Sequence, residues 1–266
     1  MKQILPRFFQ ASLLAVLIAG CAATPKDNDE TKGWSAEKLF SEAKAEQASR
    51  NYAKSIQLFE KLEARYPYGK YAQQAQLEIA YDQYKDKEPV LALAAIDRFI
   101  KSNPAHPSMD YALYLKGLVS FNEVQGFGSA VFQQDMSERD PKAERDSYEA
   151  FRTLIARFPE SRYAGDAAAR MDYLIGALAN YELHVARYYY RRGAYLAAAN
   201  RGKALIETYP KTKQVEGGLG MMVLAYDKLG MDTLRDDAKR VLLKNYPKTQ
   251  VLDGTLLEEM PWWRPW

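Results

Sequence analysis

The sequence contains very little of the chemistry that enzymes and metalloproteins use. Of its 266 residues, one is a cysteine and two are histidines. A single cysteine cannot form a disulfide within the chain, so stability must come from a core or from partners. The motifs of zinc proteases, α/β-hydrolases, P-loop enzymes and dinucleotide-binding proteins are all missing. The sequence therefore predicts a protein that is not an enzyme and holds no metal or cofactor.

An excess of one charge and long hydrophobic runs are missing as well. The chain has 37 basic and 34 acidic residues, a formal charge of +3. Removal of the N-terminal signal described below takes two basic residues and leaves +1. A nearly neutral chain gives no support to binding of nucleic acid or another polyanion. Beyond the signal, no apolar run is long enough to cross a bilayer.

Residues 1–20 have the pattern of an export signal. Lys2 and Arg7 form a positive start, and 8–18 form an apolar stretch too short to span as a transmembrane helix. The four residues IAGC that end at Cys21 resemble a bacterial lipobox. That resemblance implies cleavage before Cys21, an S-diacylglycerol on its sulfur and an acyl chain on its new amino group. An ordinary signal peptide with a chance cysteine, or a short signal anchor, is the alternative.

Residues 21–33 are predicted to form a lipidated flexible tether. They are polar, charged and without hydrophobic periodicity. Fully extended, the tether reaches only ~40 Å at ~3.3 Å per residue, so the folded domain is expected to lie close to the membrane. An aspartate directly after the lipidated cysteine would favour retention in the inner membrane. This position is Ala22, so the outer membrane is the favoured location.

Residues 34–266 are organised around a repeated helix pair, whose clearest copy is 51–85. Ile56, Phe59 and Leu62 share one face of an amphipathic helix. Pro67 ends that helix, because proline cannot continue a helix and biases the preceding residue away from helical geometry. A second helix follows, and neither helix can bury its apolar stripe alone.

Four further copies become visible when the chain is aligned on its prolines. The steps between aligned prolines are 37, 55, 51 and 37 residues. The aligned prolines are Pro67, Pro104, Pro159, Pro210 and Pro247. Five residues before them stand Leu62, Phe99, Leu154, Leu205 and Leu242, and eight residues after them Ala75, Ala112, Ala167, Gly218 and Thr255. Alternating large and small columns are what packed helix pairs require, and a period in the mid-thirties is typical of tetratricopeptide repeats.

The fold predicted from this pattern is an all-α, right-handed solenoid of about five tetratricopeptide-like repeats and about ten helices. Its parts are the N-terminal repeats 34–123, an insertion 124–140, the C-terminal repeats 141–254 and an aromatic tail 255–266. The insertion accounts for the 55-residue step and is either a binding element or a tolerated loop. The tail carries three of the four tryptophans and either caps the last helix or docks on a partner.

Two further features concern the C-terminal repeats. A second helix with no stop signal is predicted over about 163–192, where it would join the two halves of the solenoid. The glycine-rich run from Gly217 to Gly220 lies within a repeat helix. It therefore predicts close helix packing or a helix start rather than a phosphate-binding loop.

A basic and aromatic cluster lies at the end of the long helix. It consists of Arg187, Tyr188, Tyr189, Tyr190, Arg191 and Arg192. Such a cluster could stack on single-stranded nucleic acid, but neither export nor the charge supports that interpretation. The favoured interpretation turns some tyrosines inward and leaves the arginines for acidic groups of a partner protein.

Tyrosines also gather around the first repeats. They are Tyr66, Tyr68, Tyr71, Tyr81 and Tyr84. Several must belong to the core, because repeat packing requires bulk there. Any that line the concave face would suit an extended peptide, because tyrosine offers apolar area and a hydrogen-bonding tip.

Taken together, the motifs resemble one family across the whole mature chain. They are the lipobox, Arg65-Tyr66-Pro67-Tyr68-Gly69, Ala94 to Ile100, His106-Pro107, Asp110-Tyr111, Arg139-Asp140-Pro141 and Arg192-Gly193-Ala194-Tyr195. In this order they resemble the BamD family, lipoprotein subunits of the bacterial outer-membrane β-barrel assembly machine. The resemblance implies a non-enzymatic lipoprotein scaffold on the periplasmic face of the outer membrane.

The resemblance also implies partners and site residues. The C-terminal repeats would bind the BamA-like barrel subunit, in a complex with accessory lipoproteins. The N-terminal repeats would receive unfolded outer-membrane proteins. Arg201 matches the arginine that the family uses against the barrel subunit, and Arg187, Arg191 and Arg192 are candidate partner-binding residues beside it. Tyr66 matches a position associated with client recognition, and Tyr68 and Tyr71 are its candidate neighbours.

Two other function classes remain open at this point. One is a cell-wall-associated or competence-related periplasmic binding lipoprotein, which retention on peptidoglycan would indicate. The other is an envelope enzyme of the lytic transglycosylase type, some of which carry helical solenoids. Such an enzyme needs a separate catalytic domain, and five repeats leave no residues for one.

Overall fold

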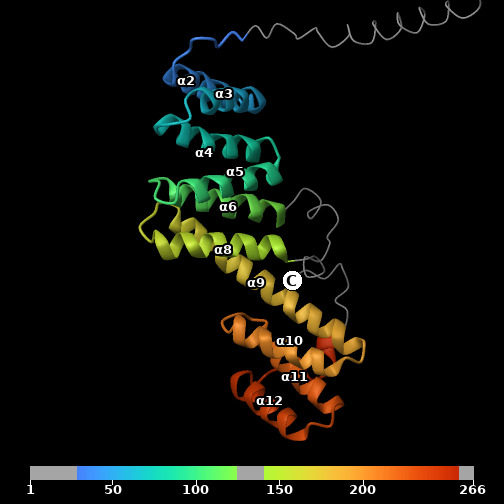
Figure 1. Cartoon of the computed structure of the whole chain (residues 1–266). Coiled ribbons are helices and arrows are strands. Elements are labelled where there is room, and N and C mark those ends of the chain that lie inside the picture. Colours follow the sequence, from blue (N-terminus) through green and yellow to red (C-terminus); the bar gives the residue numbers. More distant parts are fainter. Residues whose placement is uncertain (1–28, 125–140, 258–266) are drawn as a thin grey trace, which may run out of the picture.

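In the computed structural model, residues 29–124 and 141–257 are described, and in these ranges the chain is helical (Figure 1). The helices are α2 (Ala36–Ala48), α3 (Tyr52–Arg65), α4 (Lys70–Lys85), α5 (Pro89–Ser102), α6 (Met109–Val124), α8 (Lys142–Arg157), α9 (Ala164–Arg191), α10 (Tyr195–Thr208), α11 (Val215–Lys228) and α12 (Asp232–Asn245), followed by the 3₁₀ turn η2 (Thr255–Leu257). None of these described helices combines the length and apolarity needed to cross a membrane.

The helices stack in sequence order into an elongated solenoid (Figure 1). Each helix packs against the next one along the chain, from α2 against α3 to α11 against α12. The repeated pair that surrounds a proline turn is α3 with α4, α5 with α6, α8 with α9, and α10 with α11. Some alternate helices also contact each other, as α2 and α4 do. The predicted all-α solenoid of about ten helices is thereby confirmed.

The five proline turns share one geometry. In each, the residue before the proline has φ between −125° and −135° and ψ between 52° and 70°. Its backbone N–H donates to the carbonyl four residues earlier, at 2.7 to 2.9 Å. The residues that accept are the predicted large apolar column, and all five are fully buried: Leu62, Phe99, Leu154, Leu205 and Leu242. The same proline turn therefore ends α3, α5, α8, α10 and α12, and in each helix it follows a fully buried apolar residue.

A second shared turn lies 17 residues before the proline in four of the five copies. Gly193 and Gly230 adopt positive φ there, and the other two positions are Arg50 (φ 62°) and Lys87 (φ 66°). At each turn the next residue's N–H bonds a carbonyl five residues back, for example Asn51 to Glu46 at 2.9 Å. This is the Schellman helix ending, in which glycine is favoured because it has no Cβ.

Arg50→Gly is expected to stabilise the protein. The left-handed conformation costs a residue with a Cβ ~1 to 2 kcal/mol. Glycine avoids this cost, but it loses more conformational entropy on folding, so only part of the cost appears as added stability. We expect a gain of about 0.5 to 1 kcal/mol in the free energy of unfolding, measured by denaturant titration. Gly193→Ala, the reverse change at the equivalent turn, should destabilise. Equal stabilities for both variants and the unmodified protein would contradict this.

Small residues allow helices to approach closely at the predicted column. Ala75, Ala112 and Ala167 are fully buried. In the fourth copy the column is Gly218, and a Cβ on Gly202 of α10 would lie 2.6 Å from its carbonyl oxygen. The interpretation of the glycine-rich run as close packing is therefore confirmed, since Gly217 and Gly220 also pack against side chains.

The long helix α9 links the two halves of the solenoid. It has 28 residues, which at ~1.5 Å per residue is roughly 42 Å. Ala167 and Leu174 belong to the same core as α6 and α8, whereas Leu183 and Ala186 belong to the core of α10 and α11. The predicted continuous helix over about 163–192 is confirmed.

After α12 the described chain turns at Gly254, which adopts φ 92°, and ends in η2. One part of the predicted plan differs from the structure. Residues 29–33 were predicted to belong to the flexible tether 21–33. They instead form a turn that is hydrogen-bonded to Lys61 and Arg65 of α3. Residues 21–28, most of the insertion and the tail from residue 258 lie outside the described residues.

Candidate functional site

The first candidate surface surrounds the proline turn of the first repeat. Tyr66, Tyr68 and Tyr71, the predicted client-binding residues, lie together there but in different environments. Tyr68 is 94% exposed, whereas Tyr66 is 36% exposed and donates its hydroxyl to the carbonyl oxygen of Trp34 at 2.7 Å. Tyr71 is half-buried and packs on Phe40 with ring centroids 5.4 Å apart. Tyr68 is therefore the most accessible of the three.

Tyr81 and Tyr84 belong to the core side of the same repeats. Both are partly buried against the cluster formed by α4, α5 and α6. Burial raises the pKa of Tyr84 above its ordinary value. This confirms that several of the clustered tyrosines serve repeat packing.

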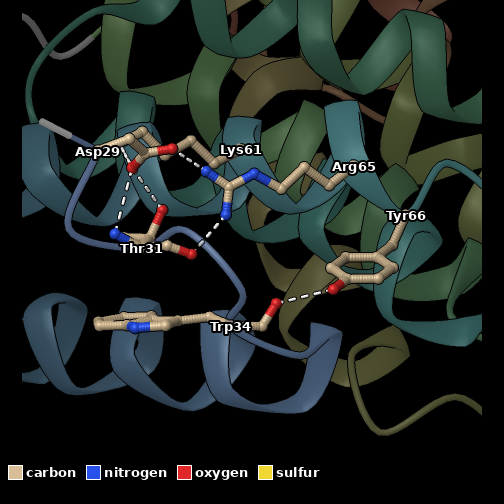
Figure 2. Close-up of polar contacts among 6 residues, drawn as sticks. All are labelled: Asp29, Thr31, Trp34, Lys61, Arg65 and Tyr66. Atoms are coloured by element: carbon tan, nitrogen blue, oxygen red, sulfur yellow. Dashed lines mark hydrogen bonds and ion pairs between the residues drawn. The ribbon is translucent and has the colours of Figure 1, made fainter. Parts of the chain in front are cut away.

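The segment from Asp29 to Trp34 covers part of the Tyr66 surface, and we call this contact the N-terminal clasp (Figure 2). Lys61 donates to the Asp29 carboxylate at 2.8 Å, and Arg65 also pairs with that carboxylate. Arg65 donates to the backbone carbonyl of Thr31 at 2.6 Å. The hydrogen bonds from Lys61 and Thr31, with the charge of Arg65, hold the pKa of Asp29 well below its usual range.

The second candidate surface contains Arg201, on α10. Its guanidinium donates to the carboxylate of Glu182 on α9 at 2.9 Å. The Arg201 side chain is 40% exposed and that of Glu182 13%. The structure therefore gives Arg201 an acidic partner within the chain, while leaving part of its side chain accessible.

The arginine and tyrosine cluster at the end of α9 divides between core and surface. Tyr189 and Tyr190 pack against the C-terminal core, and Tyr190 also meets Tyr195 with ring centroids 5.2 Å apart. Tyr188 is 46% exposed, and the Arg192 guanidinium lies over its ring at 5.4 Å. The inward turn of two tyrosines leaves little of a stacking platform for nucleic acid.

The predicted partner-binding arginines differ in exposure. Arg187 is half-buried, while Arg191 and Arg192 are exposed at the end of α9. Glu182 and, to a smaller extent, Tyr189 raise the pKa of Arg201, and both belong to α9. Arg201 therefore lies beside the stretch of α9 that carries the other three arginines.

A polar cluster between α2 and α4 was not predicted. The side-chain amide of Gln47 donates to Glu78 at 2.9 Å and to Asp82 at 2.8 Å, and Lys44 pairs with Glu78 at 3.0 Å. Asp82 is fully buried, and its burial raises its pKa above the ordinary value. Asp82 is one of many acidic residues on helices, so only its spacing of seven from the buried Ala75 could have indicated an inward position.

Asp82→Asn is expected to stabilise the protein at neutral pH. Because burial raises the pKa of folded Asp82, the stability that its protonated form contributes is present below the unfolded pKa and is lost as the pH rises through the folded pKa. Asparagine stays neutral and can still accept from Gln47. We expect a Tm a few degrees higher at pH 7, with the difference vanishing near pH 4, measured by circular dichroism. Glu78→Gln, at the more exposed site, is the control, and a lower Tm for Asp82→Asn at pH 7 would contradict this account.

Neither surface has the composition of a metal centre. Among the described residues, no group of three His, Cys, Asp or Glu side chains is placed to hold a metal ion. What the two surfaces offer is tyrosine, arginine and lysine on rigid helices, which suits recognition of protein carboxylates and peptide backbone.

Comparison with known proteins gives a consistent result. The family model YfiO, described as an outer membrane lipoprotein, matches residues 33–242. Several similar proteins are named outer membrane protein assembly factor BamD. One from Neisseria meningitidis serogroup A is 49% identical over 257 residues, covering 95% of this chain and 96% of the relative. One from Xylella fastidiosa is 40% identical over 94% of this chain and 86% of the relative. One from Vibrio cholerae is 36% identical over 88% of this chain and 97% of the relative.

Proposed function

Because the chain belongs to the YfiO family of outer membrane lipoproteins, we propose that it is a non-enzymatic scaffold for the assembly of β-barrel proteins into the outer membrane. The observation that carries this proposal is the similarity to proteins named BamD over at least nine-tenths of the chain. The resemblance to the BamD family inferred from the motifs is confirmed by the same comparisons.

We propose that the chain is anchored at Cys21 and works on the periplasmic face of the outer membrane. The lipobox pattern supports the anchor, and buried acyl chains contribute ~0.8 kcal/mol per CH₂, enough for stable attachment when several are present. Metabolic labelling with a radioactive fatty acid tests this directly. The unmodified chain should become labelled and a Cys21→Ala variant should not, and labelling of both would contradict an anchor at Cys21.

The C-terminal repeats are proposed to bind the BamA-like barrel subunit. The partly exposed guanidinium of Arg201 supports this, because arginine offers several fixed donors to a partner's carboxylates. Arg187, Arg191 and Arg192 would extend the contact along α9, and accessory lipoproteins are proposed to join the complex.

The N-terminal repeats are proposed to receive unfolded outer-membrane proteins. Tyr66, Tyr68 and Tyr71 lie together at one end of α3 and α4, and the nearly full exposure of Tyr68 supports a role in binding a peptide.

A pull-down from detergent-solubilised outer membrane tests the proposed function. The lipidated chain would be isolated with its partners, which would be identified by mass spectrometry. We expect a large β-barrel protein with periplasmic domains at a ratio near one to one. Recovery of peptidoglycan fragments without any barrel protein would instead favour a cell-wall-associated lipoprotein.

A further inference from the structure

The N-terminal clasp places a carboxylate between two cations of one helix. Lys61 and Arg65 are four residues apart on α3, so both side chains lie on the same face, and both bind the Asp29 carboxylate. We propose that Lys61 and Arg65, with Tyr66, form a carboxylate-binding site for an acidic peptide segment of a client, and that residues 29–34 are its internal occupant. The segment must then leave before an external peptide can bind.

The contacts within the clasp are of a kind that another peptide can reproduce. Arg65 binds the backbone carbonyl of Thr31, and Tyr66 binds the backbone carbonyl of Trp34. Every peptide carries such carbonyls. Three features of the segment are particular to its sequence. They are the Asp29 carboxylate, the buried Thr31, whose hydroxyl donates to that carboxylate at 2.7 Å, and the indole of Trp34, over which Lys38 lies at 4.3 Å from the ring centre. The site therefore selects an acidic residue followed about five residues later by an aromatic one.

The contacts of the N-terminal clasp are also weak enough for an external peptide to replace residues 29–34. The charged side chains remain accessible to solvent, at 24% for Asp29, 38% for Lys61 and 29% for Arg65. Ion pairs of this exposure are weakened by salt. The segment keeps its place because it belongs to the same chain and is present at a high effective concentration. An external peptide can therefore compete once the internal carboxylate is neutralised.

The proposal extends the proposed function to a defined site. Tyr66 is the predicted client-binding residue, and within the clasp its hydroxyl is bound to Trp34. It rests on the proposed function for the identity of the external peptide. The receptor and its internal occupant can be tested without a client.

Two variants of the full chain separate an internal occupant from a simple structural brace. Asp29→Asn removes the occupant's carboxylate and keeps the receptor, whereas Arg65→Gln removes part of the receptor. The probe is a fluorescein-labelled peptide with the sequence of residues 28–36, NDETKGWSA, and binding is followed by fluorescence anisotropy at low salt. We expect the Asp29→Asn chain to bind the probe at least tenfold more tightly than the unmodified chain, and Arg65→Gln to bind it more weakly than Asp29→Asn by at least tenfold.

Two controls test whether binding depends on the probe's carboxylate and on the cations of α3. A probe with asparagine in place of its aspartate should lose at least tenfold in affinity for the Asp29→Asn chain. Arg98→Gln, an exposed residue at the column of the next repeat that corresponds to Lys61, should behave as the unmodified chain. Thermal melts confirm that each variant is folded. Equal binding by Asp29→Asn and Arg65→Gln, whether both strong or both weak, would overturn the internal-occupant proposal.

An unfolded outer-membrane barrel protein supplies the second arm of the test. If it displaces the probe from the Asp29→Asn chain, the carboxylate site is part of client recognition. If the probe binds as expected but the unfolded protein does not displace it, the site and its occupant stand and the client assignment to this surface is overturned. Failure of the site and failure of the proposed function therefore give different results.

Discussion

Phe151→Ala is expected to lower the free energy of unfolding by about 3 to 5 kcal/mol, the usual cost of deleting a buried phenylalanine. Phe151 of α8 is fully buried, and its ring lies so close to α6 that a Cβ on Gly117 would come within 2.3 Å of it. This contact joins α6 and α8 on the two sides of the predicted insertion. The loss is measured by urea titration with helical circular dichroism as the signal.

A compensating pair tests whether the contact between Gly117 and Phe151 is the cause. Gly117→Ala alone should destabilise because it forces the ring to move, and Phe151→Leu alone should destabilise because it leaves a cavity. The two changes together should cost less than the sum of the single effects. Strict additivity, or a cost below about 1 kcal/mol for Phe151→Ala, would contradict this view of the junction.

Arg201→Gln is expected to weaken binding of the barrel subunit by roughly 30-fold or more, because loss of one partner of a desolvated charge pair costs about 2 kcal/mol or more. The glutamine variant is preferable to Arg201→Glu, which would place a second carboxylate against Glu182. Binding is measured by titrating the purified chain against the barrel subunit's periplasmic domains. Lys203→Gln removes another positive charge from the same helix and should leave the affinity within about threefold.

A charge swap separates a direct contact from an effect on α9. The double variant Glu182→Arg with Arg201→Glu restores an ion pair of opposite polarity between α9 and α10. If Arg201 itself contacts the partner, the double variant should bind as weakly as Arg201→Gln. Full affinity in the double variant would mean that Arg201 acts only by holding α9 and α10 together.

The helix ends were predictable because their causes are local. Pro67 and Pro247 each stop a helix through their own geometry, and the apolar residue five positions earlier is buried in every copy. A pattern that repeats five times also fixes which faces meet. The fold class, the helix bounds and the long α9 therefore followed from the sequence.

The differences arise where distant residues decide the outcome. Arg50 and Lys87 adopt positive φ because the turn between two packed helices requires it, although neither is glycine. The composition of 21–33 predicts disorder, but Asp29 meets cations 32 and 36 residues further along the chain. Such long-range pairings leave no trace in composition or local periodicity.

The residues of the candidate sites could be named from the sequence, but their partners and their exposure to solvent could not. The family resemblance pointed to Arg201, but its pairing with Glu182 depends on how α10 packs on α9. Similarly, the tyrosine cluster around Tyr66 was visible in the sequence. The exposure of Tyr68 and the cover over Tyr66 depend on the turn geometry and on the clasp.

The most direct test of the proposed assembly role is the folding of a newly supplied outer-membrane barrel protein in membranes depleted of this chain. Folding is measured as the fraction of the barrel protein that resists protease and migrates as the folded form without heating. The proposed function predicts that this fraction falls sharply on depletion and returns when the lipidated chain is added back. An unchanged folded fraction after complete depletion would contradict a role in barrel assembly.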